Sequence, residues 1–456
     1  MIVACEPSGD SNPTMRGTQR QLSFCTRPGG SLNGILRVPG DKSISHRALM
    51  FGAIAEGTTR VAGFLHAQDC LATARAFRAM AVRIDFAEDS GVTIEGVGLH
   101  GLKPPSTALD MGNSGTSMRL LAGLLCGQTF ASKLVGDASL MRRPMSRIAE
   151  PLTCMGAAIH TSAQGTAPLI IESSGELWGI AYNMPVASAQ VKSCLLLAGV
   201  YARGVTSITE PAVTRDHTER MLRAFGYPLR VAGDTVSVRG GGRLIACDIE
   251  VPADISSAAF FMVGASIAPG SDVMLAQVGV NPTRRGVIDI LRLMGADIEL
   301  VDERTVGGEP VADLRVRYAP LTGIEIPPAL VPLAIDEFPA ILIAAACATG
   351  ETVLTDAKEL RVKESDRIQV MAAGLQVCGI GATPADDGMR VRGGRLRGGV
   401  IESHGDHRIA MAFAIAGAVA DGEIVINNCE NVATSFPGFA ALATGAGLSI
   451  SEQFCA

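Results

Sequence analysis

The sequence predicts a mixed α/β protein with two domains, each made of three copies of one repeating unit. Three observations lead to this expectation. Polar helix starts recur along the 456 residues, an apolar helix and then a β-branched strand follow each start, and a charged second helix ends each copy at a turn. The copies lie farther apart than the ~20–50 residues of a solenoid repeat, so we expect them to pack as units of a globular fold.

Each copy begins with a turn followed by polar residues. Asp, Ser or Asn at such a position accepts hydrogen bonds from the free N–H groups of the first helical turn, and so marks where a helix begins. The six starts lie at residues 40–43, 112–116, 187–190, 252–256, 335–339 and 404–408. The second helices are expected to end at residues 80–82, 155–157, 225–227, 294–296, 378–380 and 446–448. Strands are expected soon after the first helices, as at residues 206–209 and 351–354.

The first of these starts shows the pattern most clearly. Pro39-Gly40 forms a turn, and Asp41, Ser43 or Ser45 could cap a helix that continues into the apolar residues 48–55. Lys42 and Arg47 then lie where the positive end of the helix dipole favours an anion. Such a stretch by itself also fits a capped helix with two solvated charges. Its recurrence favours the anion site.

The two expected domains are joined by two chain crossings. Residues 41–250 form the first domain, and residues 30–40 together with 251–456 form the second, because the segment 31–38 should pair with the second half. The helix starts would then face one cleft between the domains. Such a cleft attracts anions even though the net charge of the chain is −6. Residues 1–29 lack the pattern of a signal peptide and are expected to be a poorly ordered tail.

Composition argues against several classes of function. Aromatic residues make up only 4% of an acidic chain, so we expect neither a nucleic-acid partner nor a membrane surface. The longest apolar runs, near residues 338–349 and 409–420, are shorter than the ~20 residues of a spanning helix. Eleven cysteines occur without a C-x-x-C pair, which favours reduced thiols in a cytoplasmic protein over disulfides or zinc.

Charged residues that could bind or transform an anion gather at the helix starts. The basic ones are Lys42, Arg47, Arg119, Arg142, Arg143, Lys192, Arg215, Lys363, Arg367 and Arg408. Planar guanidinium groups bind carboxylate and phosphate oxygens through paired hydrogen bonds. Candidates for proton transfer are Asp336, which begins an apolar helix, and Glu364, which lies between cations. The alternative for the run around Glu364 is a salt-linked helix start.

Two further motifs are weaker signals. His404 and His407 are spaced like metal ligands, but no third ligand is evident, so we expect neither a metal nor a cofactor. Gly112-x-x-Gly115-Thr116 lacks the Gly-Lys-Ser/Thr of a Walker phosphate loop.

Six motifs become specific when they are taken together. They are Gly40-Asp41-Lys42-Ser43-Ile44-Ser45-His46-Arg47, Gly112-Asn113-Ser114-Gly115-Thr116, Arg143-Pro144-Met145, Ser188-Ala189-Gln190-Val191-Lys192, Arg361-Val362-Lys363-Glu364-Ser365-Asp366-Arg367 and Asp406-His407-Arg408. Their joint occurrence resembles the EPSP synthase family over about residues 32–450. The motif that begins at Ser188 resembles the second, glyphosate-tolerant class of that family.

The resemblance implies an enolpyruvyl transferase-like fold of two domains, each with three βαβαββ units in an inside-out α/β barrel, and an active site in the interdomain cleft. It implies transfer of the enolpyruvyl group of phosphoenolpyruvate to the 5-hydroxyl of shikimate 3-phosphate, with release of phosphate, in aromatic amino acid biosynthesis. It also implies a cytoplasmic monomer whose partners are these small molecules, and a target of glyphosate.

Site residues follow from the same resemblance. Shikimate 3-phosphate would be bound by Lys42, Ser43, Arg47, Ser188, Gln190, Arg215, Asp336 and Lys363. Phosphoenolpyruvate would be bound by Lys42, Gly115, Thr116, Arg143, Gln190, Arg367 and Arg408. Asp336 would accept the hydroxyl proton, while Glu364 and Lys42 would protonate the methylene carbon and reverse that step. The sequence leaves the division of these proton roles open.

The chain departs from the family pattern at one binding position, and two other readings compete with it. Thr434 precedes Ser435-Phe436-Pro437 where some members have a lysine that assists phosphoenolpyruvate binding. The sister family, UDP-N-acetylglucosamine enolpyruvyl transferase, typically carries a cysteine on a mobile loop, but here the corresponding region has only Cys126, within an apolar helical run. An inactive anion-binding scaffold would have lost the proton-transfer groups, whereas Lys42, Asp336 and Glu364 are present.

Overall fold

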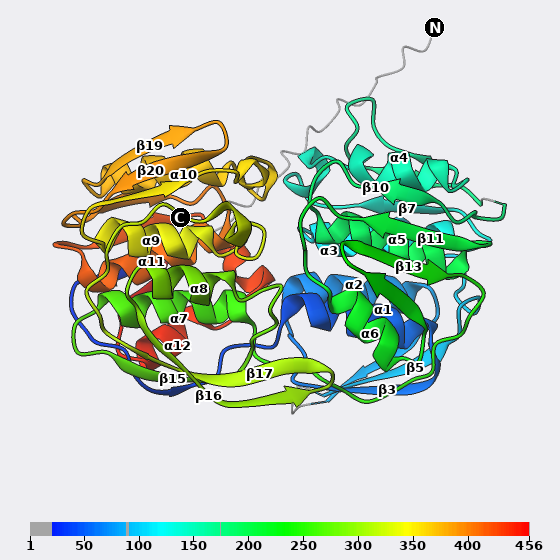
Figure 1. Ribbon diagram of the computed structural model, residues 1–456, viewed down its shortest axis with the longest axis horizontal. Coiled ribbons are helices and arrows are strands. Elements are labelled where there is room, and N and C mark those ends of the chain that lie inside the picture. The colour runs from blue at the N-terminus through cyan, green and yellow to red at the C-terminus, as the bar shows by residue number, and fades with distance from the viewer. Residues whose placement is uncertain (1–20, 88–90, 174, 456) are drawn as a thin grey trace, which may run out of the picture.

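The structure, a computed structural model, describes residues 21–87, 91–173 and 175–455. Figure 1 shows two lobes side by side, with helices in the middle of each lobe and strands above and below them. Each lobe contains three sheets and three pairs of helices. The expected α/β fold of two three-unit domains is confirmed, with the first domain holding α1–α6 and the second α7–α12.

The apolar first helices begin and end close to where the sequence places them. They are α1 (Lys42–Ile54), α3 (Gly115–Cys126), α5 (Ala189–Tyr201), α7 (Ile255–Ile267), α9 (Phe338–Cys347) and α11 (His407–Ala416). The second helices are α2 (Gln68–Ala79), α4 (Ser146–Cys154), α6 (His217–Ala224), α8 (Gly286–Leu293), α10 (Arg367–Val377) and α12 (Phe439–Gly445). Short 3-10 turns are η1 (Leu140–Arg142), η2 (Pro328–Leu330), η3 (Lys358–Val362), η4 (Gly417–Val419) and η5 (Glu430–Thr434).

Each sheet of the first domain has four strands. In spatial order they are β14 (Ile249–Glu250), β3 (Glu56–Ala62), β5 (Val92–Val97) and β4 (Arg83–Phe86); β6 (Leu109–Asp110), β7 (Ser132–Val135), β9 (Leu169–Ile171) and β8 (Ile159–His160); and β10 (Ala181–Asn183), β11 (Val205–Thr209), β13 (Thr235–Arg239) and β12 (Leu229–Ala232). In every one the first two strands are parallel and the remaining pairs antiparallel.

The second domain repeats this arrangement. Its sheets are β2 (Asn33–Leu36), β15 (Asp272–Gly279), β17 (Glu309–Arg317) and β16 (Asp297–Val306); β18 (Glu351–Leu354), β20 (Gly388–Arg392) and β19 (Gly381–Ala385); and β21 (Gly399–Glu402), β22 (Ile424–Asn427), β1 (Gln21–Arg27) and β23 (Ser449–Cys455). In the three-stranded sheet, a parallel bridge between Glu325 and Val353 stands where the others have a fourth strand.

The expectation of a tail over residues 1–29 is wrong for the segment that forms β1. This strand lies between β22 and β23, with Phe24 opposite Ile426 and buried against Phe439. A strand that pairs with residues some four hundred positions away leaves no local signal, which is why the sequence did not reveal it. Residues 1–20 lie outside the described part of the chain.

The chain passes between the domains twice. Strand β2 pairs in parallel with β15, and β14 pairs in parallel with β3, so each domain receives one strand from beyond its main segment. The buried apolar side chains form two separate cores that change over between Val38 and Ile44 and between Val251 and Ala253. Within them the apolar helices contact one another, α3 with α5 and α7 with α9 and α11, because their surfaces are apolar on nearly every side.

Polar side chains cap five of the six apolar helices. Asp41 Oδ1 accepts a hydrogen bond of 2.8 Å from the backbone N–H of Ile44, and Ser114, Ser188, Asp254 and Asp406 cap the corresponding helices in the same way. Of the three residues expected to cap the first helix, Asp41 does so. Lys42 therefore occupies the first helical position. Along the described residues, every helix is too short or too polar to span a lipid bilayer.

Candidate active site

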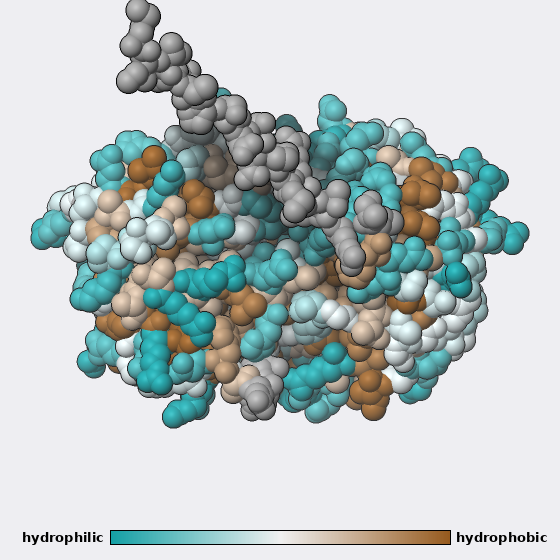
Figure 2. All heavy atoms as spheres, turned by 180° about the vertical axis from the view of Figure 1, so that it is seen from behind, coloured by the Kyte–Doolittle hydropathy of each residue, from teal (hydrophilic) through white to brown (hydrophobic). Residues whose placement is uncertain are grey.

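A cavity of about 70 Å³ lies between the two domains, where several apolar helices begin. The first domain contributes Lys42, Ser43, Asp69, Gly115, Thr116, Arg119, Arg143, Gln190 and Arg215. The second contributes Asp254, Ser256, Arg284, Asp336, Glu359, Val362, Lys363, Glu364, His407 and Arg408. Figure 2 shows mostly hydrophilic residues in the hollow between the lobes. Because a water molecule occupies ~30 Å³, the cavity admits only about two of them while the domains are this close.

Lys42 is held by a carboxylate that the sequence did not single out. Its Nζ lies 2.9 Å from Oδ2 of Asp69, which is buried at the second position of α2. Burial acts to lower the pKa of Lys42, but the carboxylates of Asp69 and Glu364 outweigh it and raise the pKa above its usual value. The ammonium group is therefore protonated at neutral pH. An acidic residue in the first turn of the second helix is the only signal that could have revealed Asp69.

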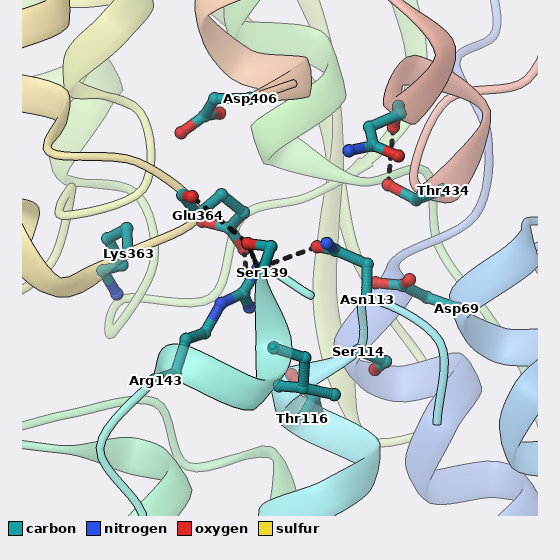
Figure 3. A network of polar contacts seen from close by, with 12 residues as sticks. Asp69, Asn113, Ser114, Thr116, Ser139, Arg143, Lys363, Glu364, Asp406 and Thr434 are labelled. Carbon is teal, nitrogen blue, oxygen red and sulfur yellow. Dashed lines mark hydrogen bonds and ion pairs between the residues drawn. The ribbon is translucent and has the colours of Figure 1, made fainter. Parts of the chain in front are cut away.

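Arg143 and Glu364 meet across the cleft from opposite domains. Arg143 Nη1 lies 3.3 Å from Glu364 Oε1, and its Nη2 donates to Oδ1 of Asn113 at 2.8 Å. Ser139 Oγ also donates to the backbone oxygen of Glu364 at 3.3 Å, so it lies between the two residues (Figure 3). A Cβ atom added to Gly115 would lie 3.2 Å from Arg143 Nη1, which places this glycine against the guanidinium group.

Thr116 and Gln190 form the adjoining wall. Gln190 Nε2 donates to Thr116 Oγ1 at 3.0 Å, and its Oε1 accepts from Arg119 Nη1 at 2.5 Å. Burial, with repulsion from Arg147 and Arg143, lowers the pKa of Arg119 to about 9. Arg119 has no carboxylate within ion-pair distance among the described residues, and its Nε is buried without a hydrogen-bond partner.

The predicted basic residues of the second domain lie against three carboxylates, those of Asp336, Glu364 and Asp406. Arg367 Nη2 lies 2.7 Å from Glu364 Oε2, while its Nε lies 2.9 Å from Asp406 Oδ2. Arg408 Nη1 donates to the backbone oxygen of Asp336 at 2.9 Å. Burial acts to lower the pKa of Arg367, but Asp406 and Glu364 raise it above its usual range. The guanidinium group of Arg367 is therefore protonated at neutral pH.

Asp336 lies at the meeting point of the domains. Lys363 Nζ is 3.2 Å from its Oδ1, and Arg215 from the first domain donates to its Oδ2. Although burial acts to raise its pKa, Lys363 and Arg215 hold the pKa well below the usual value.

Glu364 behaves in the same way. Burial acts to raise its pKa, and the charges of Arg367 and Arg143 hold it well below normal. Both carboxylates are ionised at neutral pH and are able to accept a proton.

Three predicted substrate-binding residues do not line this cavity: Arg367, Arg47 and Ser188. Arg367 is buried behind the wall and reaches the cavity through its ion pairs with Glu364 and Asp336. Arg47 is buried beneath Ser43: its Nη1 donates to the Ser43 backbone oxygen at 3.0 Å, and its other nitrogens donate to Ser193 and Thr218. Burial lowers its pKa to about 10. Ser188 lines an adjoining cavity together with Gln190, Arg215, Asp336 and Lys363. Arg47 thus supports the wall of the site, whereas Ser188 extends the site beyond Asp336.

The structure adds a buried cluster at the two chain crossings. Arg284 Nη1 lies 3.4 Å from Asp41, its Nη2 lies 3.4 Å from Asp254 and 3.6 Å from Glu337, and it donates to Ser256 Oγ at 2.6 Å. The arginine therefore joins the caps of α1 and α7 to the residue before α9. In the sequence Arg284 is followed by Arg285, and two adjacent arginines are typical of an exposed segment. No local signal therefore indicates that Arg284 is buried between carboxylates.

The two histidines weighed as metal ligands do not converge. His404 is exposed, whereas His407 is buried in the cavity wall with both ring nitrogens lacking hydrogen-bond partners. Burial, with repulsion from Lys42, holds the pKa of His407 well below normal, so its ring is neutral. No group of three or more His, Cys, Asp or Glu side chains among the described residues is placed to hold a metal ion.

Thr434, which by the family resemblance takes the place of a lysine found in some members, is not among the described residues that line the cavity. Its Oγ1 donates to the backbone oxygen of Asn431 at 2.6 Å, and Asn431 donates in turn to Gly405. The threonine is buried and stabilises η5 (Figure 3).

Comparisons with known proteins show the family to which the chain belongs. The family model described as EPSP synthase (3-phosphoshikimate 1-carboxyvinyltransferase) matches residues 26–442. The chain is 64% identical to the 3-phosphoshikimate 1-carboxyvinyltransferase of Methylococcus capsulatus, across 94% of this chain and 99% of that protein. It is 61% identical to the protein of the same name from Nitrosococcus oceani, across 96% and 99%.

Two solved structures share the fold of this chain. The EPSP synthase of Acinetobacter baumannii superposes with a TM-score of 0.85 at 57% identity, covering 95% of this chain and 100% of that one. The enolpyruvyl transferase NikO of Streptomyces tendae superposes with a TM-score of 0.77 at 16% identity, which indicates a shared fold alone.

Proposed function

Because this chain belongs to the EPSP synthase family, we propose that its interdomain cleft transfers the enolpyruvyl group of phosphoenolpyruvate to the 5-hydroxyl of shikimate 3-phosphate. The products are 5-enolpyruvylshikimate 3-phosphate and phosphate. The observation that carries the proposal is a buried cleft in which a protonated lysine and several arginines surround two ionised carboxylates. Two anionic substrates and two proton transfers call for this combination.

The phosphoenolpyruvate subsite is proposed around Arg143, Arg367 and Arg408. Gly115 and Thr116 lie at the start of α3, where backbone N–H groups and the helix dipole favour a phosphate. Lys42 and Gln190 complete the subsite. Substrate oxygens would replace Glu364 and Asp336 as partners of the arginines when the domains open and close again.

The shikimate 3-phosphate subsite is proposed on the other side of Asp336. Ser188, Gln190, Arg215 and Lys363 line one continuous cavity there. Lys42 and Ser43 line the neighbouring interdomain cavity, which shares Gln190, Arg215 and Lys363 with it. Arg47 supports this subsite by binding the backbone oxygen of Ser43 rather than by lining the cavity. Ser188-Ala189-Gln190 supports membership of the second class of the family.

The protonation states suggest how the chemistry is divided. Ionised Asp336 accepts the proton of the 5-hydroxyl group of shikimate 3-phosphate. At the same time, the oxygen of that hydroxyl group bonds to the enol carbon of phosphoenolpyruvate. Protonated Lys42 delivers a proton to the methylene carbon, which completes the tetrahedral adduct. In the second step, ionised Glu364 removes a proton from the new methyl group as phosphate departs, and the carbon–carbon double bond reforms.

We propose a monomer as the active form, because the two domains of a single chain supply both halves of the cleft. We also propose a cytoplasmic location, where a biosynthetic enzyme meets its small anionic substrates.

A phosphate-release assay with alternative acceptors tests the function. We expect release from phosphoenolpyruvate in the presence of shikimate 3-phosphate and none with UDP-N-acetylglucosamine. Release from phosphoenolpyruvate with UDP-N-acetylglucosamine as acceptor, and none with shikimate 3-phosphate, would identify the chain as a UDP-N-acetylglucosamine enolpyruvyl transferase. Binding of both substrates without release would indicate an inactive scaffold.

A further inference from the structure

Three ion pairs between described residues join the domains through carboxylates that line the cavity. They are Arg143–Glu364 at 3.3 Å, Arg215–Asp336 and Arg147–Glu359 at 2.9 Å. The first two consist of residues proposed to bind substrate or transfer protons, so they must exchange partners during the reaction. Neither member of the third pair has such a role.

The position of Arg147–Glu359 differs from that of its neighbours. The side chains of Arg147 and Glu359 are 27% and 25% exposed, compared with 7% for Arg143 and 18% for Glu364. The pair is therefore more exposed than Arg143–Glu364, although Glu359 lines both the interdomain cavity and the adjoining one. Because neither residue is assigned to a substrate, binding does not require this pair to break.

Each member of this pair belongs to a segment that carries proposed ligands. Arg147 is the second residue of α4 and follows Arg143 by four positions in the chain. Glu359 is the second residue of η3, which leads directly to Lys363 and Glu364. In addition to the contacts that Arg143 and Ser139 make with Glu364, the Arg147–Glu359 pair thus connects the segment that holds Arg143 with the segment that holds the proposed proton acceptor.

Glu359 also balances charge on the opposite domain. Arg119, Arg143 and Arg147 lie near one another, and their mutual repulsion adds to the burial that lowers the pKa of Arg119. The carboxylates of Glu359 and Glu364 oppose that effect. Once a substrate draws Glu364 away from Arg143, Glu359 remains as the carboxylate that faces this basic group.

We propose that Arg147 and Glu359 are positioning residues, whose interdomain ion pair holds η3 against α4 and so sets Lys363 and Glu364 in register with the first-domain half of the site. The inference rests on the proposed function, and it adds two residues that the sequence did not single out. A simple surface ion pair would stabilise the fold slightly and leave the reaction unchanged.

The test is a double-mutant cycle on the intact enzyme. Arg147→Ala and Glu359→Ala should each lower kcat/KM by about 3- to 10-fold, the scale of a partly exposed ion pair of up to ~1 kcal/mol together with the looser site it leaves. The double variant should be no worse than the worse single variant. Glu359→Gln, which keeps the shape and a hydrogen-bond acceptor for Arg147, should lose less than Glu359→Ala.

Charge reversal separates positioning from a general effect on stability. Arg147→Glu combined with Glu359→Arg should recover most of the kcat/KM lost by either reversal alone, because the bond across the cleft is restored. Arg315→Ala serves as the matched control, since Arg315 pairs with Asp272 at 2.8 Å but wholly within the second domain. It should leave kcat/KM unchanged.

Unchanged kinetics in both alanine variants, additive losses in the double variant, or failure of the reversed pair to recover activity would each overturn the inference. The wild-type enzyme is assayed first with shikimate 3-phosphate and phosphoenolpyruvate. Absence of phosphate release at that stage would contradict the proposed function, and with it the inference that depends on it.

Discussion

At the scale of single residues, the chemistry of the cleft depends on opposite charges that stay charged although they are buried. Glu364 alone would be protonated more easily in such a place, because burial disfavours the ionised form. Arg367 and Arg143 reverse this preference and hold its pKa well below normal. Burial likewise disfavours the charged form of Lys42 by lowering its pKa, and the carboxylate of Asp69 raises that pKa above its usual value. Each reactive group is thus matched to its proton role by a neighbour that does not itself react.

Replacing Glu364 by glutamine tests the role of this carboxylate. Gln keeps the shape but can neither accept the proton nor carry the charge, so turnover should fall by ~10²–10⁴-fold. Binding of shikimate 3-phosphate should change little, because that subsite lies beyond Asp336. Phosphate release and calorimetric titration measure the two effects. If Glu364→Gln turned over at the wild-type rate, Glu364 would be an ion-pair partner of Arg367 and would have no role in proton transfer.

Gly115 offers a second test at this scale, because a Cβ there would lie 3.1 Å from Arg119 Nη1 and 3.2 Å from Arg143 Nη1. Both atoms are the ends of flexible side chains, so Gly115→Ala should fold and displace the guanidinium groups by a few tenths of an ångström. By the family resemblance, glyphosate competes with phosphoenolpyruvate here and is slightly longer. A methyl group in a tight site is worth roughly 1–3 kcal/mol. We therefore expect glyphosate to bind about 10-fold more weakly or worse, and phosphoenolpyruvate to be affected less.

Inhibition and saturation curves for the wild type and Gly115→Ala provide the measurement. Equal inhibition constants would show that this glycine lies away from the phosphoenolpyruvate phosphate. Because this chain carries glycine at position 115, any natural tolerance must come from other positions. One example is Leu120, which is buried in α3 and, by the family resemblance, stands where sensitive members carry proline.

At the scale of elements, the site exists because helix starts from both domains are joined by one buried arginine. Asp41 and Asp254 cap α1 and α7, and both bind Arg284, which also lies near Glu337. Three carboxylates share one cation here. Removing one carboxylate therefore leaves the arginine paired, whereas removing the arginine leaves three buried acids without their common partner.

This asymmetry predicts unequal costs for two substitutions. Asp41→Ala should lower the free energy of unfolding by about 0.5–2 kcal/mol, the usual loss of a helix cap. Arg284→Met, similar in volume to the aliphatic part of arginine, should lower it by about 3–5 kcal/mol. Urea denaturation followed by circular dichroism measures both, and Asp41→Asn, which keeps the cap, is the control. Equal losses for Asp41→Ala and Arg284→Met would mean that the cluster is not held by Arg284.

At the scale of the whole molecule, two domains with separate cores are joined by two short crossings and by ion pairs across the cleft. The interdomain cavity has a volume of about 70 Å³ and is walled by both domains, so we expect the domains to separate before substrates enter. Arg215 and Lys363 come from opposite domains and both face Asp336. An anionic substrate that binds both of them would draw the domains together.

Small-angle scattering tests this motion. Shikimate 3-phosphate alone should reduce the radius of gyration, because one ligand bridges helix starts from both halves. Inorganic phosphate at the same concentration is the control, since it lacks the ring that spans the two sides. An identical scattering profile with and without saturating ligand would contradict closure by this substrate.

Features that the sequence predicted correctly are governed by residues close together in the chain. Helix starts depend on a cap and the three or four residues after it, so the beginnings of the six apolar helices were evident from motifs such as Asp41-Lys42 and Asp254-Ile255. The alternation of apolar helix, strand and charged helix likewise determined the α/β class and the number of units. The recurring motifs also placed most of the cleft residues, because each motif lies at a helix start and those starts converge.

Only the tertiary structure decided which charges are partners. Lys42 could have paired with any acid nearby, and its partner Asp69 comes from the next helix, while Arg147 meets Glu359 from the other domain. Strand β1 joins a sheet made by the far end of the chain, and Arg47 turns beneath Ser43 instead of into the cleft. Coulomb energy and hydrogen bonding depend on distances in space, and sequence spacing carries no information about those distances once residues lie on different elements. The sequence therefore determined which groups the site contains, and packing determined how they are paired, charged and placed.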